Sequence, residues 1–177
     1  MPMLKNAKKT ITVGLGGGCH WCTEAVYSSL KGVISVEQGW ISAHSPHDTF
    51  SEAVLIVINE REISLQKIIE IHLNTHSATS NHHLRNKYRS AVYVMNEEDK
   101  SRSISILEKL QTKFNAPLVT QVLDFKCFKK SDKAYIDYHY RNPNKPFCQT
   151  YIQPKLKKLL KHYPDAINKS KISSNKT

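Results

Sequence analysis

Three consecutive glycines at positions 16–18 end at Cys19, between a β-branched run and a segment with helical spacing. Glycine lets the backbone turn sharply where a Cβ atom would clash. The run before them, Thr10–Gly14, predicts a strand, and apolar residues recur with helical spacing from Cys19 to Leu30. The chain must therefore fold so that a strand turns directly into a helix at Cys19.

A helix beginning at Cys19 would direct its free backbone N–H groups at the Cys19 sulfur. Those groups and the helix dipole favour an anion, so we expect the pKa of the thiol to fall. The thiolate is the form that attacks an electrophile, and this placement therefore predicts a reactive cysteine. The alternative is a buried, inert cysteine at a tight turn, which the glycine run makes the weaker interpretation.

Cys22 forms a Cys-x-x-Cys pair with Cys19. The spacing suits a redox pair on the first helical turn, or half of a zinc site. A second such pair is missing, so zinc would need histidines such as His82 and His83. Paired histidines on a surface loop are the commoner explanation. We therefore predict redox chemistry and no metal, with a zinc-binding module as an open alternative.

The remaining elements alternate between strands and helices. Strands are predicted at Val33–Trp40, Ala53–Asn59, Ala91–Met95 and Leu118–Phe125, and helices after the caps Ser64 and Asn96 and from Lys155 to His162. This order predicts an α+β, two-layer fold. Its core would be a ferredoxin-like split β-α-β arrangement with an added helix and strand and an irregular C-terminal segment. Residues 1–164 would form one domain, and 165–177 a disordered basic tail.

The formal net charge is +11, from 26 Lys and Arg against 15 Asp and Glu, and much of the excess lies late in the chain. Aromatic residues do not interleave these lysines, so a solvated face is favoured over a nucleic-acid arm. No apolar run approaches the roughly 20 residues that span a bilayer, and Ile11–Gly18 is too glycine-rich for a secretory leader. We expect a cytoplasmic monomer without membrane or specific nucleic-acid partners.

The run from Gly17 to Glu24, GGCHWCTE, resembles the G-G-C-F-W-[GC]-x-E signature of peptide methionine sulfoxide reductase A. Further matches follow in the same order and together reach from about Thr10 to Cys148. They are L-x-G-V at Leu30–Val33, G-Y at Gly39-Trp40, E-A-V at Glu52–Val54, I-S-Y at Ile63-Ser64, Q-Y-R-S-A at Lys87–Ala91, the late F at Phe128 and N-P at Asn142-Pro143.

The resemblance implies a thiol enzyme that reduces methionine-S-sulfoxide, free or in proteins. Cys19 would attack the sulfoxide sulfur and become a sulfenic acid. Glu52 would protonate the sulfoxide oxygen, Tyr88 would hold that oxygen by a hydrogen bond, and Trp21 would be an aromatic wall of the methyl pocket. On position alone, a solvated carboxylate before a strand is the preferred interpretation of Glu52, and the resemblance reverses that preference. Tyr88 and Trp21 could be core aromatics.

The resemblance also implies how the sulfenic acid is reduced. Cys148 matches the resolving cysteine that forms a disulfide with Cys19, and Cys22 is a closer alternative. Thioredoxin or another dithiol would open that disulfide, without a cofactor. Cys127 matches no cysteine of the family pattern, and we interpret it as a structural or incidental thiol.

Four departures from the family pattern affect the substrate pocket. His20 replaces a phenylalanine of the pocket wall, and His83 replaces an aspartate. The segment before Glu52 is short, which leaves Phe50 nearest to a second oxygen-holding tyrosine, and a late acidic stretch is only faintly kept at Lys130–Tyr135. We therefore expect the sulfur chemistry to be retained with a shifted substrate preference. A thiol oxidoreductase acting on a different sulfoxide or on a disulfide remains the alternative.

Overall fold

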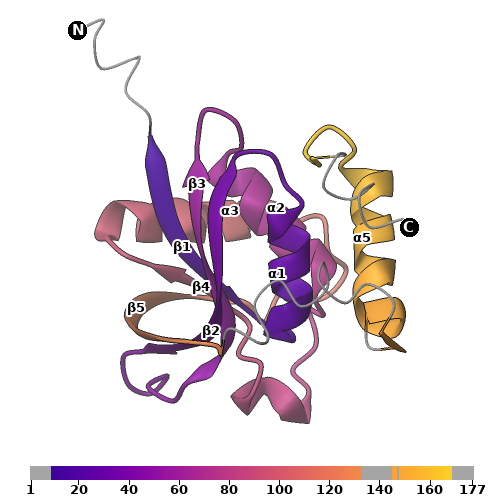
Figure 1. The fold of residues 1–177 in the computed structure, drawn as a ribbon. Coiled ribbons are helices and arrows are strands. Elements are labelled where there is room, and N and C mark those ends of the chain that lie inside the picture. The colour runs from indigo at the N-terminus through magenta and orange to yellow at the C-terminus, as the bar shows by residue number, and fades with distance from the viewer. Residues whose placement is uncertain (1–8, 133–144, 147, 169–177) are drawn as a thin grey trace, which may run out of the picture.

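The computed structural model describes residues 9–132, 145–146 and 148–168. Within these ranges, five strands form one sheet, and the helices lie outside it (Figure 1). The strands are β1 (Thr10–Gly16), β2 (Val33–Ala43), β3 (Ser51–Asn59), β4 (Ala91–Val94) and β5 (Gln121–Lys130). The α-helices are α1 (His20–Ser28), α2 (Leu65–Thr75), α3 (Glu97–Gln111) and α5 (Gln153–His162), with a short 3-10 helix at His83–Asn86 and a π-helical turn at Cys148–Ile152.

The sheet closes into a barrel in the order β1-β3-β2-β5-β4, with β4 returning to β1. Neighbouring strands are antiparallel except for β4 and β5, which pair in parallel from Ala91↔Gln121 to Val94↔Asp124. The predicted mixture of helices and strands is confirmed, but the predicted ferredoxin-like split β-α-β core is wrong, because the sheet closes. The strand expected as an addition, β5, pairs with both β2 and β4, and so it removes the two edges that an open sheet would keep.

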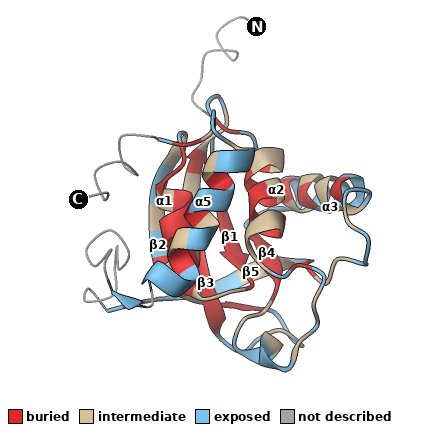
Figure 2. Ribbon diagram, turned by 90° about the vertical axis from the view of Figure 1, so that its right-hand side faces the viewer, coloured by how far each residue is buried: buried red, intermediate tan, exposed pale blue. Residues whose placement is uncertain are grey.

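The main hydrophobic core lies between the sheet and the helices α1 and α2 (Figure 2). Leu15 on β1, Val54 and Ile56 on β3, and Tyr27 on α1 are all buried there. The Tyr27 hydroxyl donates a hydrogen bond to the Ile68 carbonyl of α2 at 2.8 Å, which joins the two helices across this core. A buried hydroxyl needs such a partner, so the contact fixes how α1 and α2 pack.

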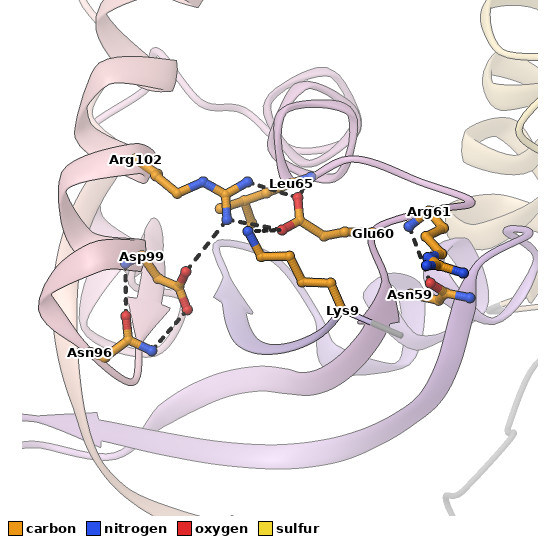
Figure 3. A network of polar contacts seen from close by, with 8 residues as sticks. All are labelled: Lys9, Asn59, Glu60, Arg61, Leu65, Asn96, Asp99 and Arg102. Carbon is orange, nitrogen blue, oxygen red and sulfur yellow. Dashed lines mark hydrogen bonds and ion pairs between the residues drawn. The ribbon is translucent and has the colours of Figure 1, made fainter. Parts of the chain in front are cut away.

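The predicted caps of α2 and α3 are confirmed. The Ser64 hydroxyl accepts from the Lys67 amide at 3.1 Å, and the Asn96 side chain accepts from the Asp99 amide at 2.8 Å. Glu60 follows directly after β3, and its carboxylate accepts two hydrogen bonds from the Arg102 guanidinium of α3, at 2.7 and 2.9 Å (Figure 3). This bidentate pair fastens α3 to the end of the sheet.

Helix α5 packs beside α1 and caps the C-terminal end of α2. The Lys155 and Lys158 ammonium groups donate to the carbonyls of Thr75 and Asn74, each at 2.6 Å. Lysines at this end of a helix satisfy its last carbonyls and oppose its dipole. The chain remains packed beyond the expected boundary at 165, because Ile167 is buried and forms a bridge with Leu30. The rest of the expected tail, 169–177, lies outside the described residues.

Over the described stretches, every helix is too short or too polar to cross a lipid bilayer.

Candidate active site

Cys19 lies at the predicted turn between a strand and a helix. Strand β1 ends at Gly16, and Cys19 is the N-cap of α1. Between them, Gly17 has φ +146°, and a Cβ atom placed on it would come within 2.5 Å of the His76 ring. Both the backbone conformation and the space therefore require glycine at position 17. The run of glycines places the cysteine directly on the first turn of α1.

The pKa of the Cys19 thiol is lowered from its ordinary value. The largest cause is a hydrogen bond from the Cys22 thiol, and the backbone N–H groups of Trp21 and Cys22 add to it. Partial burial and the charge of Glu52 oppose this shift without reversing it. The expected effect of the helix start is thus present, because the donors include amides of the first turn of α1.

Cys19 and Cys22 line the same cleft, which has a volume of about 890 Å³. Its walls come from the glycine turn, the end of α2, the loop that carries Tyr88, and α5. The lining residues are Gly17, Gly18, Cys19, Cys22, Asn74, Thr75, His76, Ser77, His82, Leu84, Tyr88, Tyr151, Pro154, Lys155 and Lys158. A ligand in this cleft would therefore reach the thiol of Cys19 and the side chain of Tyr88 together.

Glu52 lies near the start of β3 and is only 6% exposed. Its Oε1 atom lies 3.5 Å from His20 Nε2 and accepts from the His20 amide at 3.4 Å, while its Oε2 atom lies 3.6 Å from Lys87 Nζ. The β2–β3 register places Trp40 opposite Glu52. The buried carboxyl group is thus held between an imidazole and an ammonium group, close enough to Cys19 for its charge to affect the thiol.

His20 was expected in the pocket wall, and the structure places it against Glu52. It is 5% exposed, its Nδ1 atom lies 2.9 Å from the Gly39 carbonyl, and its ring meets Trp40 edge-on at 5.1 Å. Trp21 is partly buried and packs against the main core, with its ring 6.3 Å from that of His20. Phe50 is half exposed, at 48%.

Tyr88 projects into the cleft from the segment before β4. Burial is the largest cause that raises the pKa of its phenol, and the charges of Glu52 and Cys19 act in the same direction, while Lys87 opposes them. The Lys87 ammonium also lies 5.1 Å from the centre of the Tyr88 ring. A raised pKa keeps the hydroxyl protonated, so Tyr88 can donate a hydrogen bond to an oxygen in the cleft.

Two histidines at the end of α2, His72 within the helix and His76 as its C-cap, lie against the glycine turn and were not predicted from the sequence. His72 Nε2 donates to the Gly16 carbonyl at 2.8 Å, and the His76 ring stacks on it with centroids 4.1 Å apart. His76 Nδ1 donates to the His72 carbonyl, and its Nε2 lies 2.8 Å from the Ser90 hydroxyl. The available signal was their spacing of four residues at the end of a predicted helix, which places them near each other but does not indicate the contact with the glycine turn.

Burial lowers the pKa of His72 to about 4 and that of His76 well below its ordinary value. Both rings are therefore neutral at physiological pH and act as hydrogen-bond partners. Arg85 supports the same turn from the other side, because its guanidinium donates to the carbonyls of Gly17 at 2.9 Å and Tyr88 at 3.0 Å. These contacts connect the cysteine turn to the loop that carries Tyr88.

The other sequence candidates lie as follows. Cys148 begins the π-helical turn that leads into α5, and its side chain is outside the described part of the structure. Cys127 is a free, exposed thiol on β5. His82 caps the short helix His83–Asn86 by accepting from the Leu84 amide at 3.2 Å. Within the described ranges, no three His, Cys, Asp or Glu side chains are grouped as metal ligands would be.

A cysteine of lowered pKa at a helix start, beside a phenol and a buried carboxyl group, defines a site for thiol chemistry. The model of the family described as peptide methionine sulfoxide reductase matches residues 11–167. The peptide methionine sulfoxide reductase MsrA of Saccharolobus solfataricus is 32% identical over 167 residues, covering 86% of this chain and 94% of its own. The chain belongs to the peptide methionine sulfoxide reductase family.

Solved structures agree with this assignment at the level of the fold. Mxr1 from Saccharomyces cerevisiae in reduced form has a TM-score of 0.67 at 21% identity, covering 81% of this chain and 91% of that one. Mxr1 in complex with Trx2 has a TM-score of 0.55 at 19% identity, covering 73% and 85%.

Proposed function

We propose that this protein reduces methionine-S-sulfoxide, free or in peptides and proteins, with Cys19 as the nucleophile. The observation that carries the proposal is the lowered pKa of the Cys19 thiol at the start of α1, in a cleft shared with Tyr88. Family membership supports the same activity, since the matching curated relatives carry the name of this reductase. Thiolate attack on sulfur is the chemistry that such a site favours.

The reaction begins when the Cys19 thiolate attacks the sulfoxide sulfur. One proton goes to the sulfoxide oxygen, which then moves from the methionine sulfur to the Cys19 sulfur. The bond between the methionine sulfur and its oxygen and the transient bond between the two sulfur atoms both break, which leaves free methionine and a sulfenic acid on Cys19. The methionine sulfur gains the two electrons that the cysteine sulfur loses. Glu52 is the proposed donor of the proton, because its buried carboxyl lies near enough to influence the Cys19 charge.

The proposed roles of the aromatic residues concern binding. The Tyr88 hydroxyl would donate to the sulfoxide oxygen, where charge develops as the sulfur is attacked. Trp21, beside Cys19 on α1, would contact the methyl group of the substrate. His20 was expected to share that contact, but its place against Glu52 leads us to assign it a different part below.

Cys148 is the proposed resolving cysteine, and Cys22 is the alternative. In either case a second thiol attacks the sulfenic sulfur, water leaves and a disulfide forms, which thioredoxin or another dithiol then reduces. The Cys22 contact with Cys19 supports the alternative. The place of Cys148 at the entry to α5, which lines the same cleft, supports the first assignment. We propose a cytoplasmic monomer that needs no metal or organic cofactor.

The test is reduction of L-methionine-S-sulfoxide, with dithiothreitol and with thioredoxin as separate reductants. We expect turnover for the wild type, none for Cys19→Ser, and a loss of about 10²-fold or more for Glu52→Gln. Turnover by Cys19→Ser equal to that of the wild type would reject the assignment. Reduction of insulin disulfides without sulfoxide reduction would instead favour a general disulfide oxidoreductase.

The resolving cysteine is tested separately, by comparing Cys148→Ser with Cys22→Ser. Loss of the resolving thiol should leave one turnover intact and stop the following turnovers when thioredoxin is the reductant, because the sulfenic acid then accumulates. The variant that shows this arrest identifies the resolving residue. If only Cys22→Ser is arrested, the assignment of Cys148 is wrong.

A further inference from the structure

The Glu52 carboxyl group has a titratable partner that the proposed mechanism does not yet use. His20 Nε2 lies 3.5 Å from Glu52 Oε1, and both side chains are almost fully buried, with exposed fractions of 7% and 8%. The His20 amide donates to the same oxygen. An imidazole and a carboxyl group facing each other out of contact with bulk water can share one proton.

The other ring nitrogen of His20 fixes the tautomer. Nδ1 lies 2.9 Å from the carbonyl oxygen of Gly39, which can only accept a hydrogen bond. Nδ1 therefore carries a hydrogen, and Nε2 is the nitrogen that gains or loses a proton on the side of Glu52. The edge-on contact with Trp40, at 5.1 Å, holds the ring in this orientation.

The groups around this pair come from several elements. Lys87, before β4, lies 3.6 Å from Glu52 Oε2. Cys19 and Tyr88 both respond to the charge of Glu52. The Lys129 ammonium, on β5, lies 6.0 Å from the centre of the Trp40 ring, and the Trp40 ring in turn contacts His20. Among these groups, His20 is the buried one that faces the Glu52 carboxyl group directly, with Nε2 3.5 Å from Oε1.

We propose that His20 is a positioning residue that supplies a proton to Glu52, so that the carboxyl group can act as an acid at neutral pH. Before the sulfoxide oxygen is protonated, the imidazolium passes its Nε2 proton to the Glu52 carboxylate. This leaves a neutral imidazole and a protonated carboxyl group, which gives that proton to the sulfoxide oxygen. Solvent then restores the proton on Nε2. The inference rests on the proposed function, and it explains why a histidine next to the nucleophile faces Glu52 and not the cleft.

The test is the pH dependence of a single turnover, with the reduced full-length protein and L-methionine-S-sulfoxide but no reductant. We compare the wild type with His20→Gln, which keeps an amide for hydrogen bonding but cannot titrate. The single-turnover rates of the wild type and His20→Gln should agree within about threefold near pH 5. Near pH 8 the rate of His20→Gln should be about tenfold lower than that of the wild type. The fall of the single-turnover rate with rising pH, here called the alkaline fall, should thus occur at lower pH in His20→Gln than in the wild type.

Two further variants separate this effect from a general effect of charge or structure. Lys87→Met removes the cation at the other carboxyl oxygen but keeps the imidazole, so its alkaline fall should stay in place or move to higher pH. His162→Gln, an exposed change on α5, should give the wild-type profile. A shift in Lys87→Met like that in His20→Gln would contradict the inference.

A uniform loss in His20→Gln at every pH, or no loss at any pH, would overturn the role of His20, since neither shows a titrating partner. Failure of the proposed function itself has a different signature. In that case the wild type would form no methionine at any pH, or Cys19→Ser would match it, and the inference would fall with the function.

Discussion

The Cys22 thiol donates a hydrogen bond to the sulfur of Cys19, and this contact is the largest cause of the lowered Cys19 pKa. Both cysteines are reduced in the structure, with no disulfide between them. The second cysteine of the Cys-x-x-Cys pair therefore acts on the first even before any disulfide forms. Its buried position, at 4% exposure, protects this contact from competing water.

Replacement of Cys22 should make Cys19 less reactive at neutral pH. In Cys22→Ala the hydrogen bond is lost, so the Cys19 pKa rises and the pH midpoint of its alkylation by iodoacetamide moves upward. Cys22→Ser keeps a donor at the same position, and its midpoint should stay closer to that of the wild type. The measurement follows the Cys19 peptide by mass spectrometry, because Cys127 is exposed and also reacts. Equal midpoints for Cys22→Ala and the wild type would show that the contact has no effect.

Two neighbouring glycines should differ in their tolerance of a methyl group. Gly17 has a positive φ and a Cβ there would collide with His76, whereas the atoms nearest to a Cβ on Gly18 are 3.8 Å away or more. Gly17→Ala should lower the free energy of unfolding by roughly 1–3 kcal/mol and slow sulfoxide reduction. Gly18→Ala should change stability little. Guanidinium unfolding of both variants measures the difference, and equal stabilities would refute this account of the turn.

His72 should make the protein less stable as the pH falls below about 6.5. Its folded pKa is about 4, below its ordinary value of 6.5, because it is buried. The unfolded chain therefore binds a proton first, and stability present above about pH 6.5 is lost as the pH approaches 4. The loss from this residue is at most about 3 kcal/mol. His72→Gln should flatten the curve of unfolding free energy against pH in this window. An unchanged slope would mean that His72 is not the cause.

Glu60 should contribute stability at neutral pH that is lost in acid. The hydrogen bonds from Arg102 are the largest cause that lowers the Glu60 pKa. A lowered carboxyl pKa gives stability that is present above the unfolded value of about 4.3 and lost as the pH falls through the folded value. Arg102→Met should lower the free energy of unfolding by roughly 1–2 kcal/mol near pH 7, and by less in acid. Lys126→Met, on the exposed face of β5, is the control and should change the unfolding free energy little. A loss of unfolding free energy in Arg102→Met that is the same at every pH would contradict this assignment.

Local signals in the sequence predicted local structure well. The glycine run predicted the turn at Cys19, and Ser64 and Asn96 were recognised as caps because each is a capping residue type just before a helical pattern. The fall in the Cys19 pKa was predicted from the helix start, but its largest cause, the Cys22 thiol, was not. The closed barrel was missed because the parallel pairing of β4 with β5 joins strands separated by the whole of α3. Strand patterns show that a strand exists, but not which second neighbour it takes.

The same limit applies to the candidate site. Cys19 could be identified from its immediate neighbours, whereas the place of His20 depends on β2 and β3 packing against α1. His72 contacts Gly16 across 56 residues, which no local pattern indicates. Cys148 was assigned by resemblance to the family alone, and its role stays a prediction.

The most direct test of the central claim is to locate the oxygen after one turnover. Reduced protein is mixed with one equivalent of L-methionine-S-sulfoxide in the presence of dimedone, which traps sulfenic acids, and its peptides are then mapped by mass spectrometry. The account predicts release of methionine together with a trapped sulfenic acid on Cys19, or a disulfide that joins Cys19 to Cys148 or Cys22. Methionine release with the Cys19 peptide unmodified, or with oxidation only at Cys127, would contradict it.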